Sequence, residues 1–411
     1  MHAEILSVGD EVVSGQVVDS NAAWLSRRLL ERGIPVVAHA AVRDVRSEIS
    51  DAVREAAARS DLVIVTGGIG PTHDDRTREA VADAAGADLV LDPASLEHVR
   101  EVFAARGVDM PRSNEKQATV PSGAAVLPNT LGTAAGFRVA LGSAAVFVLP
   151  GVPPEMRTMF DEAVVPLLPA GEGAVVTRTL RCFGLSESLI AETLTGRIDL
   201  EGNPAVALLA SEGVISVKFT AWAETEPAAR ERIREPLRRA RDLLGDAVFG
   251  DDADTLPGVV ARLLRSRGKT LAVAESCTGG LATHWLTDVP GISESLLEGV
   301  VAYSNRSKTR LLGVPEGLFS TVGAVSETVA RLLAEGARLN AGADVGVGIT
   351  GIAGPAGGSP EKPVGTVHIA VATEAETLHR PLRLRGPRRQ IKDRAAKHAL
   401  DVVRRVLLAA T

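Results

Sequence analysis

The stretch Ala274-Glu-Ser-Cys-Thr-Gly-Gly280 decides how the C-terminal part of this chain folds. It follows an apolar run at residues 270–274, typical of a buried strand, and precedes residues 281–285, which have helical spacing. A strand, a glycine-rich turn and a helix in this order expose the side chain at the turn. Ser276 is therefore our candidate nucleophile, with backbone N–H groups beside it for a developing oxyanion.

A serine needs a base to take its proton, and we expect Lys308, in Tyr303-Ser-Asn-Arg-Ser-Lys308, to serve as that base. We expect the like charges of Arg306 and Arg310 to lower the pKa of its amine, and burial to add to the effect. Serine–lysine pairs are a known variant of the catalytic triad.

Two other interpretations of the same stretch stay open. Ser276-Cys-Thr-Gly-Gly280 is also typical of a plain turn with a helix cap. Cys277 is a second candidate nucleophile, although no histidine stands in these motifs to activate it. A lone cysteine is more often a small core residue.

A second glycine-rich segment, Gly348-Ile-Thr-Gly-Ile-Ala-Gly-Pro-Ala-Gly-Gly358, surrounds Thr350 after an apolar run from Val345. Glycines let the backbone approach a phosphate closely. Three such pieces within one domain length favour a substrate pocket over independent turns.

These motifs resemble one family. From about Leu256 onward the chain resembles the C-terminal domain of CinA proteins, whose relatives are nicotinamide mononucleotide deamidases. The resemblance is carried by AESCTGG, PGISES at residues 290–295, YSNRSK, GITGIAGPAGG and KPVGTV at residues 362–367. It implies an α/β serine–lysine amidohydrolase that needs no cofactor, forms an acyl-enzyme, and releases ammonia and nicotinic acid mononucleotide.

The resemblance also implies roles for single residues. Ser276 is the nucleophile, Lys308 the base, and Tyr303 and Thr350 complete the catalytic set. The chain reads Gly386-Pro-Arg388 where the family has Gly-Asp-Arg. The expected substrate-binding residues are Thr278, Gly279, Gly280, Asn305, Gly351, Gly354 and Arg388.

Composition bounds the whole chain. Its 411 residues are too many for one ordinary domain and predict two or three. Acidic residues outnumber basic ones 51 to 45, so there is no electrostatic signal for nucleic acid. Cys182 and Cys277 are the only cysteines, which argues against a disulfide framework and a cysteine zinc site. No apolar run is long enough for a membrane span and the start lacks a leader pattern, so we expect a cytoplasmic protein without membrane association.

The N-terminal region, residues 1–169, alternates strand and helix patterns. Strands are expected at residues 4–8, 35–42 and 62–66, and helices at 22–32, capped by Ser20 or Asn21, and at 48–59. The third strand opens into Gly67-Gly-Ile-Gly-Pro-Thr-His-Asp-Asp75. Ligands bind at the carboxyl ends of strands in open α/β sheets, so we expect chemistry there.

This loop matches neither a Walker loop nor a dinucleotide fingerprint. Asp74 and Asp75 follow its backbone donors and are hard oxygen ligands for a magnesium ion that holds phosphate oxygens. Asp10 and Asp44 follow the first two strands and are expected at the same rim. Such a rim suits pyrophosphate cleavage. Alternatively, Asp74 or Asp75 caps a helix that begins near Thr77, and Asp10 and Asp44 are plain turn residues.

The segments GDEVVSGQVVDSNAAWL, TGGIGPTHDD, NEKQA and LPGVPPEM resemble the N-terminal domain of CinA, which is akin to molybdopterin-binding proteins. The resemblance implies a three-layer α/β domain that hydrolyses ADP-ribose with Mg²⁺ or another divalent metal, and with K⁺. Asp44 and Asp75 match the acidic catalytic positions, and Ala135 stands where a proline is usual. The metal ligands are then Asp10, Asp74 and Asp75, and the substrate-binding residues are Gly67, Gly68, Gly70, Thr72, Lys116 and Thr133. A domain that binds or adenylylates a pterin is the alternative.

Residues 170–253 are expected to form a small α+β domain, after a linker at residues 166–173, and residues 254–411 the deamidase domain. In CinA the middle region is compared with KH modules, which bind RNA. The chain has no Gly-x-x-Gly loop there, and the arginines of residues 227–244 are expected to form ion pairs within one helix. We therefore expect a spacer or dimerisation element, a homodimer, and nucleotides rather than nucleic acid as ligands. A non-catalytic adaptor for DNA uptake is the remaining alternative.

Overall fold

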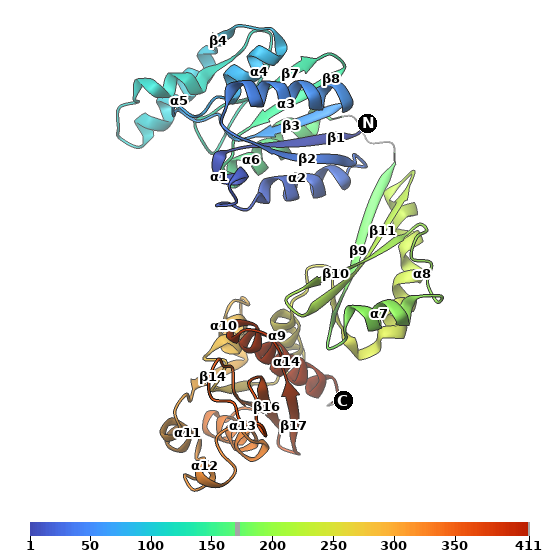
Figure 1. Cartoon of the computed structure of the whole chain (residues 1–411), viewed down its shortest axis with the longest axis vertical. Helices are drawn as coiled ribbons and strands as arrows, with labels where there is room; N and C mark the ends of the chain where they lie inside the picture. Colours follow the sequence, from blue (N-terminus) through green and yellow to red (C-terminus); the bar gives the residue numbers. More distant parts are fainter. Residues whose placement is uncertain (169–172, 410–411) are drawn as a thin grey trace. The chain divides into compact units, whose positions relative to one another are not determined.

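The computed structural model describes residues 1–168 and 173–409 (Figure 1). These form two compact units. One consists of Met1–Val176 with Trp222–Arg230, and the other of Thr177–Ala221 with Glu231–Thr411. The expected linker at residues 166–173 lies partly outside the described residues.

The N-terminal sheet has six strands in the order β2-β1-β3-β8-β7-β6. The first four strands of this order pair in parallel, and β7 and β6 pair antiparallel. The strands are β1 (Ala3–Val8), β2 (Val36–Val42), β3 (Leu62–Thr66), β6 (Ala125–Leu127), β7 (Gly136–Leu141) and β8 (Ala144–Leu149), with β4 (Leu89–Leu91) and β5 (Thr119–Pro121) in a separate pair. The helices are α1 (Asp10–Val13), α2 (Ser20–Leu30), α3 (Arg46–Arg59), α4 (Thr77–Ala85), α5 (Pro93–Ala105) and α6 (Pro153–Met159).

Helices cover both faces of this sheet (Figure 1). Alternate residues of β1 enter two different cores: Leu6 packs in the core under α3 and α4, and Ile5 in the core under α2 and α6. A strand buried on both faces is the pattern expected for the parallel part of a three-layer domain. The predicted cap of the first long helix is wrong, because the side chain of Asp19 accepts from the Ala22 N–H.

The middle domain has a four-stranded sheet in the order β10-β11-β9-β12 with two helices. Its elements are β9 (Ala174–Phe183), α7 (Glu187–Leu194), β10 (Ala205–Ser211), β11 (Val214–Ala223), α8 (Glu226–Leu244) and β12 (Val248–Asp251). The strand β12 was not predicted from the sequence pattern. It pairs antiparallel with β9.

The basic helix α8 neutralises much of its own charge, as expected. Arg230 pairs with Glu226, Arg234 with Glu231, and Arg238 with both Glu235 and Asp242.

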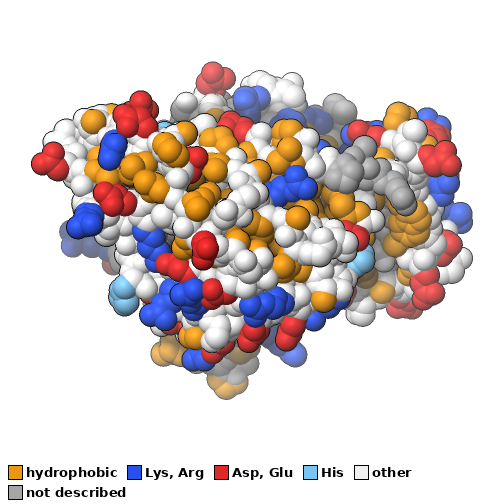
Figure 2. Space-filling view, turned by 90° about the horizontal axis from the view of Figure 1, so that it is seen from above, with side chains coloured by type: hydrophobic (Ala, Val, Ile, Leu, Met, Phe, Trp, Pro, Cys, Tyr) orange, Lys and Arg blue, Asp and Glu red, His pale blue; other side chains and the backbone are white. Residues whose placement is uncertain are grey.

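On the face drawn in Figure 2, Lys and Arg side chains lie among Asp and Glu side chains. Among the described residues, no helix combines the length and the apolar composition needed to cross a membrane.

The C-terminal sheet has five strands in the order β14-β13-β15-β16-β17. The first three pair in parallel and the last two antiparallel. The strands are β13 (Leu271–Glu275), β14 (Leu296–Val301), β15 (Val345–Gly351), β16 (Thr366–Ala372) and β17 (Thr377–Arg383). The helices are α9 (Leu256–Ser266), α10 (Leu281–Thr287), α11 (Asn305–Leu312), α12 (Leu318–Thr321), α13 (Glu327–Ala341) and α14 (Arg388–Ala409).

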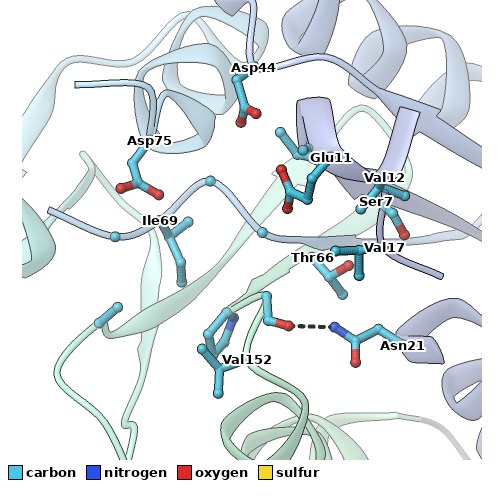
Figure 3. Close-up of a pocket in the computed structure, with 18 of the residues that line it drawn as sticks. Ser7, Glu11, Val12, Val17, Asn21, Asp44, Thr66, Ile69, Asp75 and Val152 are labelled. Atoms are coloured by element: carbon cyan, nitrogen blue, oxygen red, sulfur yellow. Dashed lines mark hydrogen bonds between the residues drawn. The ribbon is translucent and has the colours of Figure 1, made fainter. Parts of the chain in front are cut away.

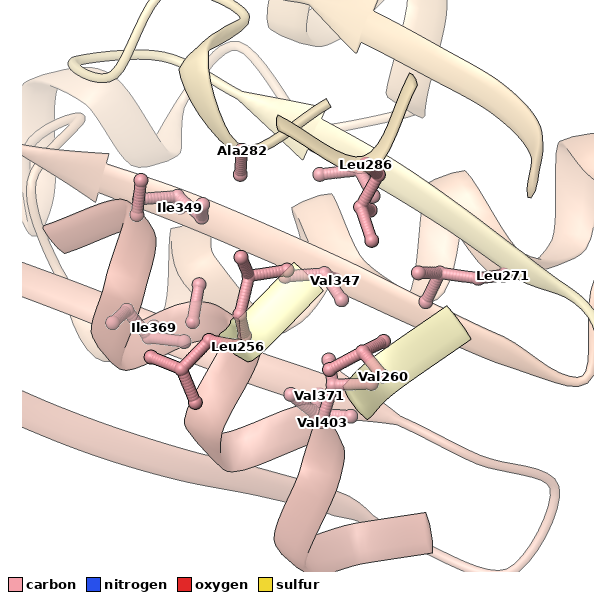
Figure 4. Close-up of a cluster of buried hydrophobic side chains, with 14 of the residues drawn as sticks. Leu256, Val260, Leu271, Ala282, Leu286, Val347, Ile349, Ile369, Val371 and Val403 are labelled. Atoms are coloured by element: carbon pink, nitrogen blue, oxygen red, sulfur yellow. The ribbon is translucent and has the colours of Figure 1, made fainter. Parts of the chain in front are cut away.

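Two cores clamp this sheet. Leu271 of β13 packs with α9, α10 and α14 in the larger core (Figure 4), whereas Ala272 and Ala274 pack with α11 and α13. At Gly348 in β15 a Cβ atom would collide with the Ala330 carbonyl of α13, so glycine permits the close approach of helix and strand.

Candidate active sites

The central strands of the C-terminal sheet bring the two glycine-rich motifs together. β13 and β15 pair in parallel with Glu275 opposite Ile349. Ser276 follows Glu275 and Thr350 follows Ile349, so these two residues lie at the same carboxyl edge of the sheet, where α/β sheets bind ligands. Segments about 74 positions apart in the chain thus meet in one place.

A cavity of about 210 Å³ lies at this edge. Ser276 and Lys308 both line it, as the serine–lysine prediction requires. The other lining residues are Cys277, Tyr303, Asn305, Ala324, Val325, Thr350, Gly351, Ala353 and Arg388. Thr278, Gly279, Gly280 and Gly354, which were expected to bind substrate, are not among them.

Lys308 is placed by the first turns of α11. Ser304 caps this helix by accepting from the Ser307 N–H. The Lys308 side chain is 2% exposed, and its Nζ donates to the Tyr303 carbonyl oxygen at 3.0 Å. Burial lowers the pKa of the Lys308 amine. The expectation that Arg306 and Arg310 contribute was wrong, because desolvation alone drives the shift.

Ser276 lies in the turn between β13 and α10. Its own N–H donates to the Ile349 carbonyl at 3.0 Å, and the Gly279 N–H donates to the Ser276 carbonyl at 3.2 Å. Gly280 occupies the cap position of α10 without a side-chain bond, so the interpretation of Ser276 as a helix cap was wrong.

The start of α10 is instead held by Glu275, which sequence reasoning missed. This carboxylate is fully buried and accepts from the N–H groups of Ala282 and Thr283 and from the Thr283 hydroxyl. In the sequence, the only sign of this role is an acidic residue at the end of an apolar run, directly before the serine. A carboxylate at the N-terminal end of a helix also interacts favourably with the helix dipole.

Cys277 lines the cavity, but burial raises the pKa of its thiol to about 12. A thiol with that pKa stays protonated near neutral pH and is a poor nucleophile. This favours Ser276 over Cys277.

Arg388 reaches the cavity although Pro387 replaces the family's aspartate. Its guanidinium donates to the Gly354 carbonyl at 2.7 Å and to the Tyr303 hydroxyl at 2.9 Å. Arg388 is the first residue of α14, where the preceding proline fits the helix start. The aspartate is therefore not needed to place this cation.

The N-terminal domain has a larger pocket of about 520 Å³ at the carboxyl ends of β1, β3 and β8 (Figure 3). The predicted residues Gly67, Gly68, Gly70, Thr72, Thr133, Asp44, Asp74 and Asp75 line it. Asp10 and Lys116 do not. Lys116 instead donates to the Asp75 carbonyl and pairs with Glu79 at 3.1 Å.

Asp44 lies at the acidic side of this pocket. It accepts from the Asp10 N–H at 2.8 Å, so the first two strands do bring these residues together. Burial, and then the negative charges of Asp10, Glu11 and Asp74, raise the pKa of the Asp44 carboxyl. Asp75 accepts from the Thr72 N–H at 2.8 Å and from its hydroxyl. Capping of α4 was the wrong alternative, because Arg76 holds the cap position without a side-chain bond.

The pocket is also lined by polar residues that were not predicted to bind a ligand, among them Glu11, Asn21 and Glu155. Asn21 donates to the Gly151 carbonyl at 2.8 Å and ties α2 to the loop after β8 (Figure 3). Within residues 1–168 and 173–409 there is no group of three or more His, Cys, Asp or Glu side chains arranged to hold a metal. The predicted trio of Asp10, Asp74 and Asp75 is thus not preassembled.

The fold and these sites define a multidomain α/β protein with a pocket at the carboxyl edge of each of two sheets. Three family models match it in the predicted order: "Probable molybdopterin binding domain" at residues 4–170, "Damage-inducible protein CinA KH domain" at 177–250 and "CinA C-terminal domain" at 253–407. The chain is 46% identical to a CinA-like protein of Geobacter sulfurreducens over the full length of both, and 42% identical to one of Kosmotoga olearia over 99% of both. This protein belongs to the CinA family.

Among solved structures, the chain is similar to the CinA protein of Thermoplasma acidophilum, which is described as a protein of unknown function. The two are 34% identical with a TM-score of 0.38, over 41% of this chain and 98% of that one.

Proposed function

We propose that the C-terminal cavity deamidates nicotinamide mononucleotide to nicotinic acid mononucleotide and ammonia. The observation that carries the proposal is the pair of Ser276 and Lys308 lining one small cavity, with an amine whose pKa is lowered by burial. A lysine that is partly neutral can accept a proton from a serine hydroxyl.

In the first half-reaction Lys308 Nζ takes the proton of the Ser276 hydroxyl as Oγ attacks the carboxamide carbon. We assign the oxyanion to backbone N–H groups of the turn around Ser276, of which Cys277 lines the cavity. The tetrahedral adduct collapses as the Lys308 ammonium returns its proton to the departing nitrogen. Ammonia leaves and an ester of Ser276 remains.

In the second half-reaction water attacks the ester carbon while Lys308 accepts a water proton. The carbon–Oγ bond then breaks, Oγ regains a proton from Lys308, and the carboxylic acid product is released. Arg388, held between Tyr303 and Gly354, supplies a positive charge for the nucleotide.

We further propose that the N-terminal pocket hydrolyses ADP-ribose to AMP and ribose 5-phosphate with Mg²⁺ or a similar divalent ion, and with K⁺. Mg²⁺ commonly uses one or two carboxylates together with water and substrate phosphates. Asp44, Asp74 and Asp75 line the pocket and fit that mode, in which the nucleotide completes the ligand set. The metal would neutralise charge on the pyrophosphate; the glycine loop would bind its oxygens through backbone N–H groups.

A pterin-binding or adenylylating N-terminal domain is the second candidate, favoured by the match to a molybdopterin-binding domain. Affinity for a pterin compared with ADP-ribose separates the two. The cytoplasmic location, the homodimer and the preference for nucleotides over DNA or RNA remain our predictions.

The deamidase proposal is tested by incubating the full chain with nicotinamide mononucleotide and measuring ammonia. Wild type is expected to release it, and Ser276→Ala to be at least about a thousandfold slower with its folding unchanged. Full activity in Ser276→Ala would refute the assignment. Binding to DNA at low salt, measured in parallel, would support the adaptor alternative.

A further inference from the structure

The KPVGTV motif has no part in the chemistry above, yet its first residue reaches the wall of the serine cavity. Lys362 Nζ donates to the carbonyl oxygens of Val322 at 2.7 Å and Val325 at 2.8 Å. Residues 322–325 join α12 to α13, and Ala324 and Val325 line the cavity. Lys362 itself does not line it. Any influence of Lys362 on a ligand is therefore indirect.

We call residues 322–325 the wall segment. Each of its four carbonyl groups accepts a hydrogen bond from a side chain. Lys362 holds the first and the last, the Ser326 hydroxyl holds Gly323 at 3.0 Å, and the Thr350 hydroxyl holds Ala324 at 2.8 Å. The N–H groups of Val322 and Gly323 donate to the Leu318 carbonyl of α12, and the carbonyl side of the wall segment is held by these side chains rather than by strand pairing.

Lys362 is well placed to hold two carbonyls at once. An ammonium group carries three donors, and charge-assisted bonds are stronger than neutral ones. Its backbone is itself held, because the Lys362 N–H donates to the Ser359 hydroxyl and the Ser359 N–H donates to the Lys362 carbonyl. Gly323 turns the wall segment with a φ of 78°, and a Cβ there would lie 3.5 Å from Lys362 Nζ.

We propose that Lys362 is a positioning residue that preforms the wall segment and thereby sets how tightly the cavity binds its substrate. This inference rests on the proposed deamidase function. Without the ammonium, ordering residues 322–325 becomes part of the cost of binding, whereas Ser276 and Lys308 keep their places. Loss of Lys362 consequently affects KM more than kcat.

The test uses Lys362→Met in the full chain. For ammonia release we expect KM to rise about tenfold and kcat to change less than about threefold, since substrate affinity is lost but the reacting groups are not. Hydrogen–deuterium exchange should increase in peptides that cover residues 322–328 and stay unchanged in β13. Lys269→Met is the matched control, because Lys269 pairs with Asp344 at 2.9 Å and lines no part of the cavity.

Rescue sharpens the test. Alkylation of Lys362→Cys with bromoethylamine creates an ammonium group at nearly the original length, and this should restore the wild-type KM. Wild type treated in the same way is the control for alkylation of the buried Cys182 and Cys277. Unchanged KM in Lys362→Met, a loss confined to kcat, or a raised KM without faster exchange at residues 322–328 would each overturn the proposal. If wild type releases no ammonia, the deamidase function fails, and exchange alone then decides whether Lys362 holds the wall segment.

Discussion

The two pockets of this chain shift the pKa of an ionisable side chain in opposite directions. In the C-terminal cavity a single amine is buried, and burial lowers its pKa without any partner of like charge. In the N-terminal pocket, carboxylates crowd one side, and burial and their mutual repulsion raise the pKa of Asp44. The first environment shifts the Lys308 amine toward its neutral form. The second favours the arrival of a cation.

The two sites also differ in how closely their polar groups are gathered. Ser276, Lys308 and Arg388 line one cavity of about 210 Å³. The pocket is more than twice as large, and the described residues hold no complete metal ligand set. We therefore expect the two activities to respond independently to mutation, chelation and pH.

The largest effect is expected for Lys308→Met, which should lower ammonia release about a thousandfold because the base is lost. The same change should raise the melting temperature, since the buried ammonium donates to a carbonyl rather than to a carboxylate and Met has a similar length. Steady-state assays and thermal unfolding check the two results. Ammonia release within tenfold of wild type would exclude Lys308 as the base.

Asp75→Ala should lower ADP-ribose hydrolysis about a hundredfold, because the nucleotide-bound metal loses a carboxylate. Chelation with EDTA should abolish that activity and leave ammonia release unchanged. Asp51→Ala is the control, because Asp51 is exposed, pairs with Arg54 and lines no part of the pocket. Hydrolysis that survives chelation would remove the metal from the mechanism.

The pH dependence of ammonia release should follow Lys308. Its folded-state pKa is lowered below the ordinary 10.5, so kcat/KM should rise about tenfold per pH unit until the amine is neutral and then level off. In the window between the lowered pKa and 10.5 the unfolded chain binds a proton that the folded chain does not. Folding stability in that window therefore rises with pH through this group. A rate that falls over this range would contradict the assignment.

The smallest effect is expected for Asp44→Asn. The raised pKa means that the Asp44 carboxyl binds a proton more tightly in the folded chain than in the unfolded chain. Through this group, the folding stability of the protein therefore falls as the pH rises above 3.8, the pKa of the carboxyl in the unfolded chain. Removing its charge should raise the melting temperature at neutral pH by about 1–3 °C, while the amide oxygen can still accept from the Asp10 N–H. ADP-ribose hydrolysis should fall in the same variant. A lower melting temperature would show that the carboxylate is stabilising.

The structure agrees best with the sequence-based predictions where a local pattern determines the fold. Residues 62–66 read as a buried strand and are β3, and the glycine break after β13 placed Ser276 at the edge of the sheet. Apolar runs bounded by glycine leave few alternatives for the backbone.

The predictions failed where several local partners compete. Asp19 rather than Ser20 caps α2. Asp75 accepts a hydrogen bond from the Thr72 N–H instead of capping α4. Lys116 was expected to bind the substrate, but its ammonium group donates to the Asp75 carbonyl and forms an ion pair with Glu79. Each error concerns which of several nearby polar groups a side chain chooses, and that choice depends on distances set by the fold.

The sequence by itself determined the order of strands and helices, the three-domain layout and the positions of the reactive side chains at strand ends, because hydrophobic spacing and glycine breaks act locally. Only the tertiary structure decided that Ser276 and Lys308 share one cavity, that burial alone prepares the amine, and that Lys362 reaches the wall segment. Proximity and desolvation arise from packing between segments distant in the chain, and no local pattern encodes them.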